Sequence, residues 1–224
     1  MDREELLRQA MEKERENRIY QKRKRVFGSA HGLMDCTFDK DNGSTPQLEY
    51  ARRYVEHWPE MRKENMGLLF WGPAGTGKTF AAACIANALV EREVGVRLIT
   101  LGEALLNLYG MSGEERIGYL EVLTTCGLLI LDDFGVERRT PYAREQVYEI
   151  INRRYLSGRP MIVTTNLTLE ELKHADRDDE RIHDRVLERC VPVCFNGPSL
   201  RRENAARKIR RARALLKSQD GRLD

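Results

Sequence analysis

The segment GPAGTGKT, from Gly72 to Thr79, has the residue types and the spacing of a phosphate-binding loop. It matches the pattern G-x-x-x-x-G-K-[ST] in full, with an apolar run before it and an alanine-rich run after it. Glycines let backbone N–H groups converge on a polyphosphate, and the helix that follows directs its positive end toward the same phosphates. Lys78 would contact the β- and γ-phosphates, and the Thr79 hydroxyl would ligate Mg²⁺. The candidate nucleotide-contacting residues are Gly72, Pro73, Ala74, Gly75, Thr76, Gly77, Lys78 and Thr79.

Two adjacent carboxylates end another apolar run, in the segment GLLILDDFG at residues 127–135. Asp132 is placed to hold Mg²⁺, directly or through water, so Thr79 and Asp132 are the candidate metal ligands. Asp133 could polarise an attacking water. On its own this pattern is also typical of a strand that ends in a surface turn. Downstream of a phosphate-binding loop, however, it indicates ATP and Mg²⁺ as the cofactors.

Other polar groups could reach a γ-phosphate, and the residues leave two interpretations open for each. The segment PMIVTTN ends in Asn166, whose amide could orient water near the γ-phosphate or simply cap the next turn. Arg181 and Arg185 lie one helical turn apart, and Arg201 follows the last apolar run. An arginine could stabilise transition-state charge, from the same chain or from a neighbour. The alternative for Arg181 and Arg185 is a salt-bridged surface, because acidic residues surround them.

Short apolar runs alternate with helical patterns, which predicts an α/β fold with a mainly parallel five-stranded sheet and helices on both faces. The expected strands are residues 66–71, 96–101, 128–131, 161–165 and 191–195. The expected helices of this body are residues 46–62, 79–92, 103–109, 114–125, 141–156, 178–190 and 201–217. Ligands of such sheets bind at the carboxyl ends of the strands, where the candidate residues stand.

The N-terminal part of the chain has a different pattern. Residues 2–25 carry dense mixed charge at helical spacing, have few apolar positions and end in the basic run Lys22–Arg25. This predicts a solvated helix, which is either a charged end without a role or an arm that contacts a partner or a nucleic acid. Residues 26–46 contain several glycines and predict a linker.

Composition excludes several classes of protein. The 224 residues are 41% hydrophobic and 33% charged, with a net charge of +3. No apolar run approaches the roughly 20 residues of a spanning helix, so a membrane protein is excluded, as are collagen-like chains and disulfide scaffolds. The five cysteines are scattered, and the N-terminal residues lack the apolar core of a signal peptide. We therefore expect free thiols and a cytoplasmic location.

Five motifs together resemble those of the AAA+ ATPases of the DnaC/DnaI helicase-loader type and of their IstB-like relatives. They are GPAGTGKT, LLILDDFG, VTTN, RIHDRV and GPSLRREN. The resemblance covers the chain from TFD at residues 37–39, so it implies a charged helical segment at 1–36 and an AAA+ ATP-binding domain at 37–224. It also implies an ATP-dependent ring or spiral that self-associates through its ATP sites. Asn166 would then be sensor 1, Arg185 the finger that reaches a neighbour's ATP, and Arg201 sensor 2.

The resemblance leaves three functions open. The first is an ATPase that loads a hexameric replicative helicase onto single-stranded DNA, with residues 1–35 on the helicase and the basic ends on DNA. The second is a transposition helper ATPase of the IstB type, and the third is an adaptor that uses ATP as a switch with little turnover. Asp133 stands where AAA+ proteins usually have Glu, and this shorter side chain favours slow hydrolysis. The N-terminal segment is short and lacks the zinc-binding cysteines that some loaders carry.

Overall fold

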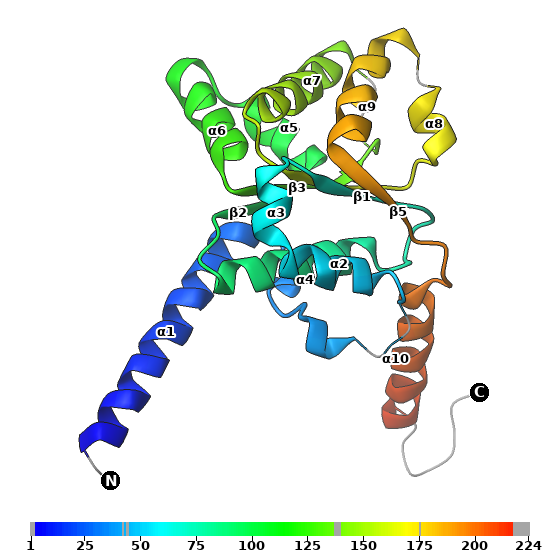
Figure 1. Cartoon of the computed structure of the whole chain (residues 1–224). Coiled ribbons are helices and arrows are strands. Elements are labelled where there is room, and N and C mark those ends of the chain that lie inside the picture. The colour runs from blue at the N-terminus through cyan, green and yellow to red at the C-terminus, as the bar shows by residue number, and fades with distance from the viewer. Residues whose placement is uncertain (1–2, 42, 44, 137–139, 175, 217–224) are drawn as a thin grey trace.

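The computed structural model of the chain describes residues 3–41, 43, 45–136, 140–174 and 176–216. Within these residues a five-stranded sheet forms in the order β2-β3-β4-β1-β5, and every pairing is parallel (Figure 1). The strands are β1 (Gly67–Trp71), β2 (Val96–Thr100), β3 (Leu128–Phe134), β4 (Met161–Thr165) and β5 (Cys190–Cys194). The predicted fold class is confirmed.

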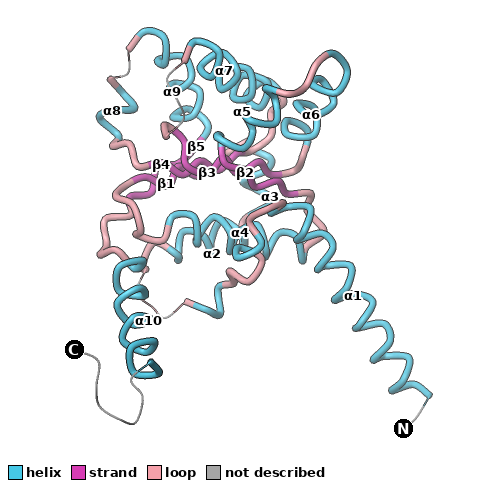
Figure 2. The backbone as a smooth tube through the Cα atoms, turned by 180° about the vertical axis from the view of Figure 1, so that it is seen from behind, coloured by secondary structure: helices cyan, strands magenta, loops and turns pink. Residues whose placement is uncertain are grey.

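Helices cover both faces of this sheet, as Figures 1 and 2 show from opposite sides. The helices on one face are α2 (Leu48–Glu56), α3 (Trp58–Lys63) and α4 (Lys78–Glu91). Those on the other face are α5 (Leu101–Tyr109), α6 (Gly113–Thr125), α7 (Pro141–Leu156), α8 (Leu169–Lys173) and α9 (Arg177–Arg189). Each face has its own apolar core. Strands buried on both faces need apolar residues at every position, which explains the unbroken apolar runs in the sequence.

The strand order brings the chemistry-bearing segments together. β4 lies between β3 and β1, with Val163 level with Leu131 on one side and with Leu69 on the other. Because all these strands are parallel, their carboxyl ends meet at one edge of the sheet. The phosphate-binding loop, the carboxylates and Asn166 therefore leave the sheet side by side.

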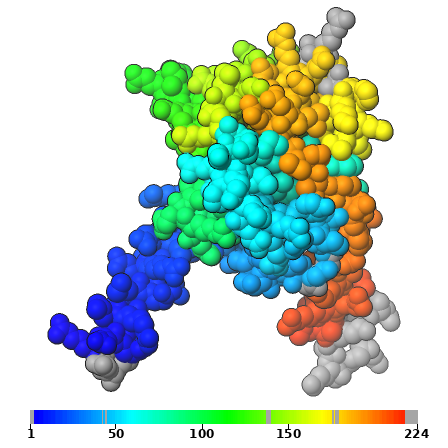
Figure 3. Space-filling model, in the orientation of Figure 1, coloured from blue at the N-terminus to red at the C-terminus, as the bar shows by residue number. Residues whose placement is uncertain are grey.

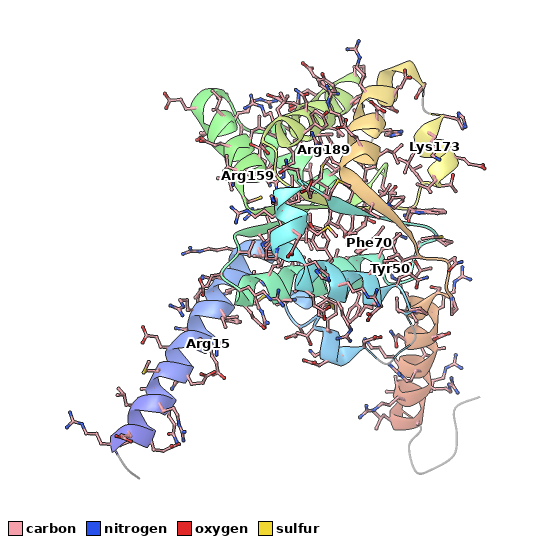
Figure 4. All side chains as sticks on the ribbon, viewed as in Figure 1. Arg15, Tyr50, Phe70, Arg159, Lys173 and Arg189 are labelled. Atoms are coloured by element: carbon pink, nitrogen blue, oxygen red, sulfur yellow. The ribbon has the colours of Figure 1, made fainter. Side chains whose placement is uncertain are left out.

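Two helices project from the body of the molecule. α1 (Arg3–Phe27) and α10 (Leu200–Leu216) stand out as separate arms in the space-filling view (Figure 3). Figure 4 shows the side chains of α1, Arg15 among them, standing in solvent. The C-terminal end of α1 is anchored to the body: Val26 and Phe27 are buried in the core, Lys22 pairs with Glu93, and Arg23 pairs with Glu91 of α4 at 2.5 Å. The predicted solvated N-terminal helix is present.

The segment predicted as a linker is more ordered than expected. It contains the short 3₁₀ helices η1 (His31–Leu33) and η2 (Phe38–Lys40). Val26, Phe27 and Met34 belong to the apolar core of the α4 face. The sequence pattern missed this because isolated apolar residues between glycines have no helical or strand period.

Other elements differ in detail. The helix expected at 46–62 is broken at His57 into α2 and α3, with Pro59 at the start of the second helix. α8 was not expected, and β3 continues through both aspartates to Phe134. All five cysteines are free, and Cys84 and Cys190 are the buried ones. None of the helices in the described part of the chain has the length and apolarity needed to cross a bilayer.

Candidate nucleotide-binding site

The phosphate-binding loop is a tight turn between β1 and α4. Gly72 and Gly75 have φ angles of +127° and +85°, a region that residues with a side chain rarely adopt. A Cβ atom would also collide with the Phe195 carbonyl at Gly72 and with the Ser199 hydroxyl at Gly75. The Leu200 N–H donates to Gly75 O at 2.9 Å, so the start of α10 is fixed to the loop.

Lys78 uses all three ammonium hydrogens in this structure. Its Nζ donates to Gly72 O at 2.6 Å, to Pro73 O at 2.8 Å and to Asn166 Oδ1 at 2.9 Å. The side chain is 6% exposed. Burial lowers the pKa of Lys78, the nearby carboxylates of Asp133 and Asp132 oppose this, and Arg201 adds to it. All three acceptors are neutral carbonyl oxygens, so a polyphosphate would be a stronger partner for this cation.

Asp132 is buried at 5% exposure and accepts two hydroxyl hydrogen bonds. Thr79 Oγ1 lies 3.0 and 3.2 Å from its carboxylate oxygens, and Thr164 Oγ1 donates to Oδ1 at 2.5 Å. Burial raises the pKa of Asp132, and the hydrogen bonds from Thr164 and Thr79 oppose that rise. A carboxylate and a hydroxyl in contact are hard oxygen donors of the kind that Mg²⁺ takes, so Thr79 and Asp132 fit this ion.

Asp133 differs from Asp132 in exposure and in backbone conformation. Its φ is +57°, and a β-bulge between Leu131 and Phe134 interrupts the pairing with β4. The Asp133 N–H donates to Thr164 Oγ1 at 3.0 Å. This geometry turns the Asp133 side chain out of the sheet, where it lines the cavity described below. An exposed carboxylate at that position is accessible to a water molecule, as a water-polarising residue must be.

Thr164 is a site residue that sequence reasoning missed. Its hydroxyl donates to Asp132 and accepts from the Asp133 backbone, so it orders both aspartates. The signal was available in the sequence, because Thr164 precedes Asn166 at the end of an apolar run. Recognising it would have required knowing that β4 lies beside β3.

Asn166 faces Lys78, and the turn after it is capped by other residues. The Leu167 N–H donates to Thr165 Oγ1 at 3.1 Å, and Thr168 caps α8. Of the two interpretations left open, the contact with Lys78 agrees with a position beside the γ-phosphate.

A cavity of about 1240 Å³ joins these groups. Lys78, Thr79, Asp133 and Asn166 line its centre, and Lys40, Asp41 and Thr45 come from the segment before α2. α10 adds a set of cations: Arg201, Arg207, Lys208 and Arg210. Such positive charge suits a polyanion, and Arg201 lines the same cavity as Lys78.

Arg185 is not among the residues that line this cavity. It lies on α9, where its guanidinium donates to Arg181 O at 2.9 Å and stacks near the rings of Tyr148 and Tyr155, at 5.0 and 5.6 Å. The structure therefore brings Lys78, Asp132, Asp133, Asn166 and Arg201 together and leaves Arg185 apart from them.

Replacing Asp132 by asparagine should stabilise the nucleotide-free protein at neutral pH. The pKa of Asp132 is higher in the folded chain than its ordinary value of 3.8 in the unfolded chain. Folding therefore becomes less favourable as the pH rises above 3.8. The amide removes this cost and still accepts hydrogen bonds from Thr79 and Thr164. We expect the midpoint of thermal unfolding to rise by roughly 2–5 °C near neutral pH and the gain to vanish in acid. A lower midpoint at neutral pH would contradict the assignment, and Mg²⁺-dependent nucleotide binding should fall in the same variant.

The sequence profile of the family described as "IstB-like ATP binding protein" matches residues 2–210. The chain belongs to the IstB-like ATP-binding protein family. This IstB-like chain is 32% identical over 200 residues to the replicative helicase loader DnaC of Escherichia coli (strain K12), which covers 84% of the chain and 79% of DnaC. It is 26% identical over 185 residues to the replicative helicase loader DnaI of Bacillus subtilis (strain 168), across 75% of the chain and 59% of DnaI.

Solved structures show the same fold for this IstB-like chain. A crystal structure of DnaI superposes with a TM-score of 0.61 at 22% identity, covering 75% of this chain and 92% of that one. A crystal structure of the DnaC helicase loader superposes with a TM-score of 0.57 at 23% identity, covering 73% and 96%. The fold is thus that of the AAA+ ATP-binding proteins, and the residues of the site fit ATP.

Proposed function

We propose that this chain is a DNA-replication ATPase that loads a hexameric replicative helicase onto single-stranded DNA. The observation that carries the proposal is the similarity to DnaC along 84% of the chain, which includes the whole phosphate-binding loop. In this proposal the subunits associate through their ATP sites in the cytoplasm. Residues 1–36 form the helicase-docking segment, and residues 37–224 form the ATP-binding domain.

In this proposal hydrolysis is slow and depends on partners. Lys78 and Thr79 hold the phosphates and Mg²⁺ together with Asp132, and Asp133 positions the water. Asp133 is one methylene shorter than the more usual glutamate, so a water must lie closer to the strand to reach it. Bound Mg²⁺ would supply charge to offset the phosphates, while Asn166 and Arg201 hold the γ-phosphate in place.

Basic side chains at both ends are the proposed contacts to DNA. α10 carries Arg201, Arg202, Arg207, Lys208, Arg210, Arg211 and Arg213, with Glu203 as its acidic residue. The N-terminal arm contributes the run Lys22–Arg25. Binding through such side chains releases counterions, so affinity for single-stranded DNA should fall steeply as salt is raised.

A helicase-docking role for α1 can be tested with the full-length chain. Leu7 and Met11 lie one helical turn apart on the projecting part of α1 and are 62% and 63% exposed. We expect the double substitution Leu7→Glu and Met11→Glu to weaken co-purification with the replicative helicase by about tenfold or more, because two apolar side chains that would be buried against the helicase are replaced by charged ones. Retained ATP binding would show that the body is intact.

The matched control adds the same charge at the same spacing elsewhere on the helix. Asn17→Glu with Gln21→Glu introduces two carboxylates on exposed positions and leaves the apolar pair in place. Equal loss in both variants would indicate a charge effect, and no loss in either would contradict docking through α1.

A transposition helper ATPase is the second candidate, favoured by the match to the IstB-like profile. It shares the ATP-binding core, so the site does not separate the two. Co-purification with a transposase, or a transposase gene next to this one, would favour this candidate.

The third candidate is an adaptor that is switched by ATP. It predicts ATP binding without turnover even when helicase and DNA are present, and the short side chain of Asp133 favours it.

A further inference from the structure

Arg52 on α2 makes three contacts with the turn formed by residues 38–41. Its Nη2 donates to Phe38 O at 2.9 Å and lies 3.9 Å from Asp41 Oδ2. The guanidinium carbon lies 4.8 Å from the centroid of the Phe38 ring. A planar guanidinium is suited to this combination, because its face stacks on a ring while its edge donates hydrogen bonds.

The turn held by Arg52 forms part of the nucleotide cavity. Asp41 lines the cavity together with Lys40 and Thr45, and Thr45 is buried at 6% exposure. The carboxylate of Asp41 repels phosphate groups, whereas the cations of α10 and Lys78 attract them. The neutral nucleoside therefore fits the wall formed by Lys40, Asp41 and Thr45, where the Asp41 carboxylate and the Thr45 hydroxyl can accept from ribose hydroxyls or from amino groups of the base.

A second tether holds the same segment from α4. Asn87 is 1% exposed, and its Nδ2 donates to Leu33 O at 3.0 Å and to Cys36 O at 2.8 Å. Residues 33–41 lie outside the sheet and are held by side chains from α2 and α4, and their last two members, Lys40 and Asp41, line the cavity. Asn87 anchors the beginning of this segment in the core, and Arg52 fixes the part that faces the nucleotide.

We propose that Arg52 is a positioning residue for the nucleoside part of ATP. It holds Phe38 and Asp41 so that the wall of Lys40, Asp41 and Thr45 is formed before the nucleotide enters. It therefore adds affinity for base and ribose and none for the phosphates. This inference depends on the proposed ATP-binding function, because it assigns a wall of that same cavity.

The test compares ATP with inorganic tripolyphosphate, which has the phosphates without the nucleoside. Calorimetric titration of the full-length chain should show that Arg52→Ala raises the Kd for ATP about tenfold, the usual effect of losing one hydrogen bond to a charged group. The Kd for tripolyphosphate should stay unchanged. Arg53→Ala is the matched control, because Arg53 is the next residue on α2, pairs with Glu49 and is 69% exposed. It should change neither value.

Arg52→Lys adds a second check. Lysine keeps a positive charge near Asp41 but loses the stacking on Phe38, so its Kd for ATP should lie between those of wild type and Arg52→Ala. An unchanged Kd for ATP in Arg52→Ala would overturn the inference, and so would an equal loss for ATP and tripolyphosphate, which would indicate a general structural role. If the wild-type chain bound tripolyphosphate as tightly as ATP, the nucleoside wall would be refuted while the phosphate site stood. If it bound neither, the proposed function itself would fail.

Discussion

Replacing Lys78 by alanine is expected to weaken ATP binding by about 100-fold or more, the largest effect of any single substitution at the site. Lys78 is the cation whose ammonium points into the phosphate-binding loop, and its three hydrogen bonds hold it between Gly72, Pro73 and Asn166. A polyphosphate that replaces these acceptors gives the ammonium charge-assisted contacts in place of bonds to neutral oxygens. Titration with a fluorescent ATP analogue measures the loss directly.

Two controls make the Lys78→Ala result interpretable. Lys173→Ala removes an exposed lysine from α8, on the far side of the sheet from α4 (Figure 4), and should leave ATP affinity unchanged. The thermal midpoint of Lys78→Ala in the absence of nucleotide shows whether the variant is folded. Unchanged ATP affinity in a folded variant would refute the assignment of the loop.

Much of the site could be predicted from the sequence because its chemistry is local in the chain. A glycine loop between a strand and a helix, and carboxylates at the end of an apolar run, each need only a few adjacent residues. Parallel strands then bring their carboxyl ends together, so Lys78 contacts Asn166, and the next residue, Thr79, contacts Asp132. Their catalytic roles remain predictions.

The residue roles that could not be predicted from the sequence depend on contacts between segments that are distant in the chain. Thr164 and Arg52 gain their roles from the pairing of β4 with β3 and from the packing of α2 on the segment before it. Both residue types are common on protein surfaces, so neither stands out without the fold. The buried apolar residues of the expected linker are another case, because Phe27 and Met34 pack only once α4 and the sheet are formed.

The position of Arg185 bears on how subunits cooperate. The sequence left open whether this arginine serves its own ATP or that of a neighbour. In the structure it stacks with Tyr148 and Tyr155 of α7 and does not line its own cavity. A role at a γ-phosphate would therefore require an interface between two copies of the chain, as the family resemblance implies for Arg185.

Arg185→Ala should therefore abolish ATP hydrolysis by the assembled protein, a loss of about 1,000-fold for an arginine of this kind, while ATP binding by each chain stays close to wild type. The matched control is Arg189→Ala, one turn further along α9 (Figure 4). This change removes a guanidinium that also stacks on Tyr155, at 4.7 Å. Because it leaves Arg185 in place, it should retain hydrolysis. Steady-state phosphate release with helicase and single-stranded DNA present is the measurement.

Mixing two inactive variants decides whether Arg185 acts on a neighbouring subunit. An Arg185→Ala chain has an intact phosphate-binding loop, and a Lys78→Ala chain has an intact Arg185. Where the two meet in one assembly, the first binds ATP and the second supplies the arginine, so the mixture should regain hydrolysis that neither variant has alone. A mixture as inactive as its components would place Arg185 in its own subunit's chemistry or outside the chemistry altogether, and hydrolysis by Arg185→Ala at the wild-type rate would remove it from the site.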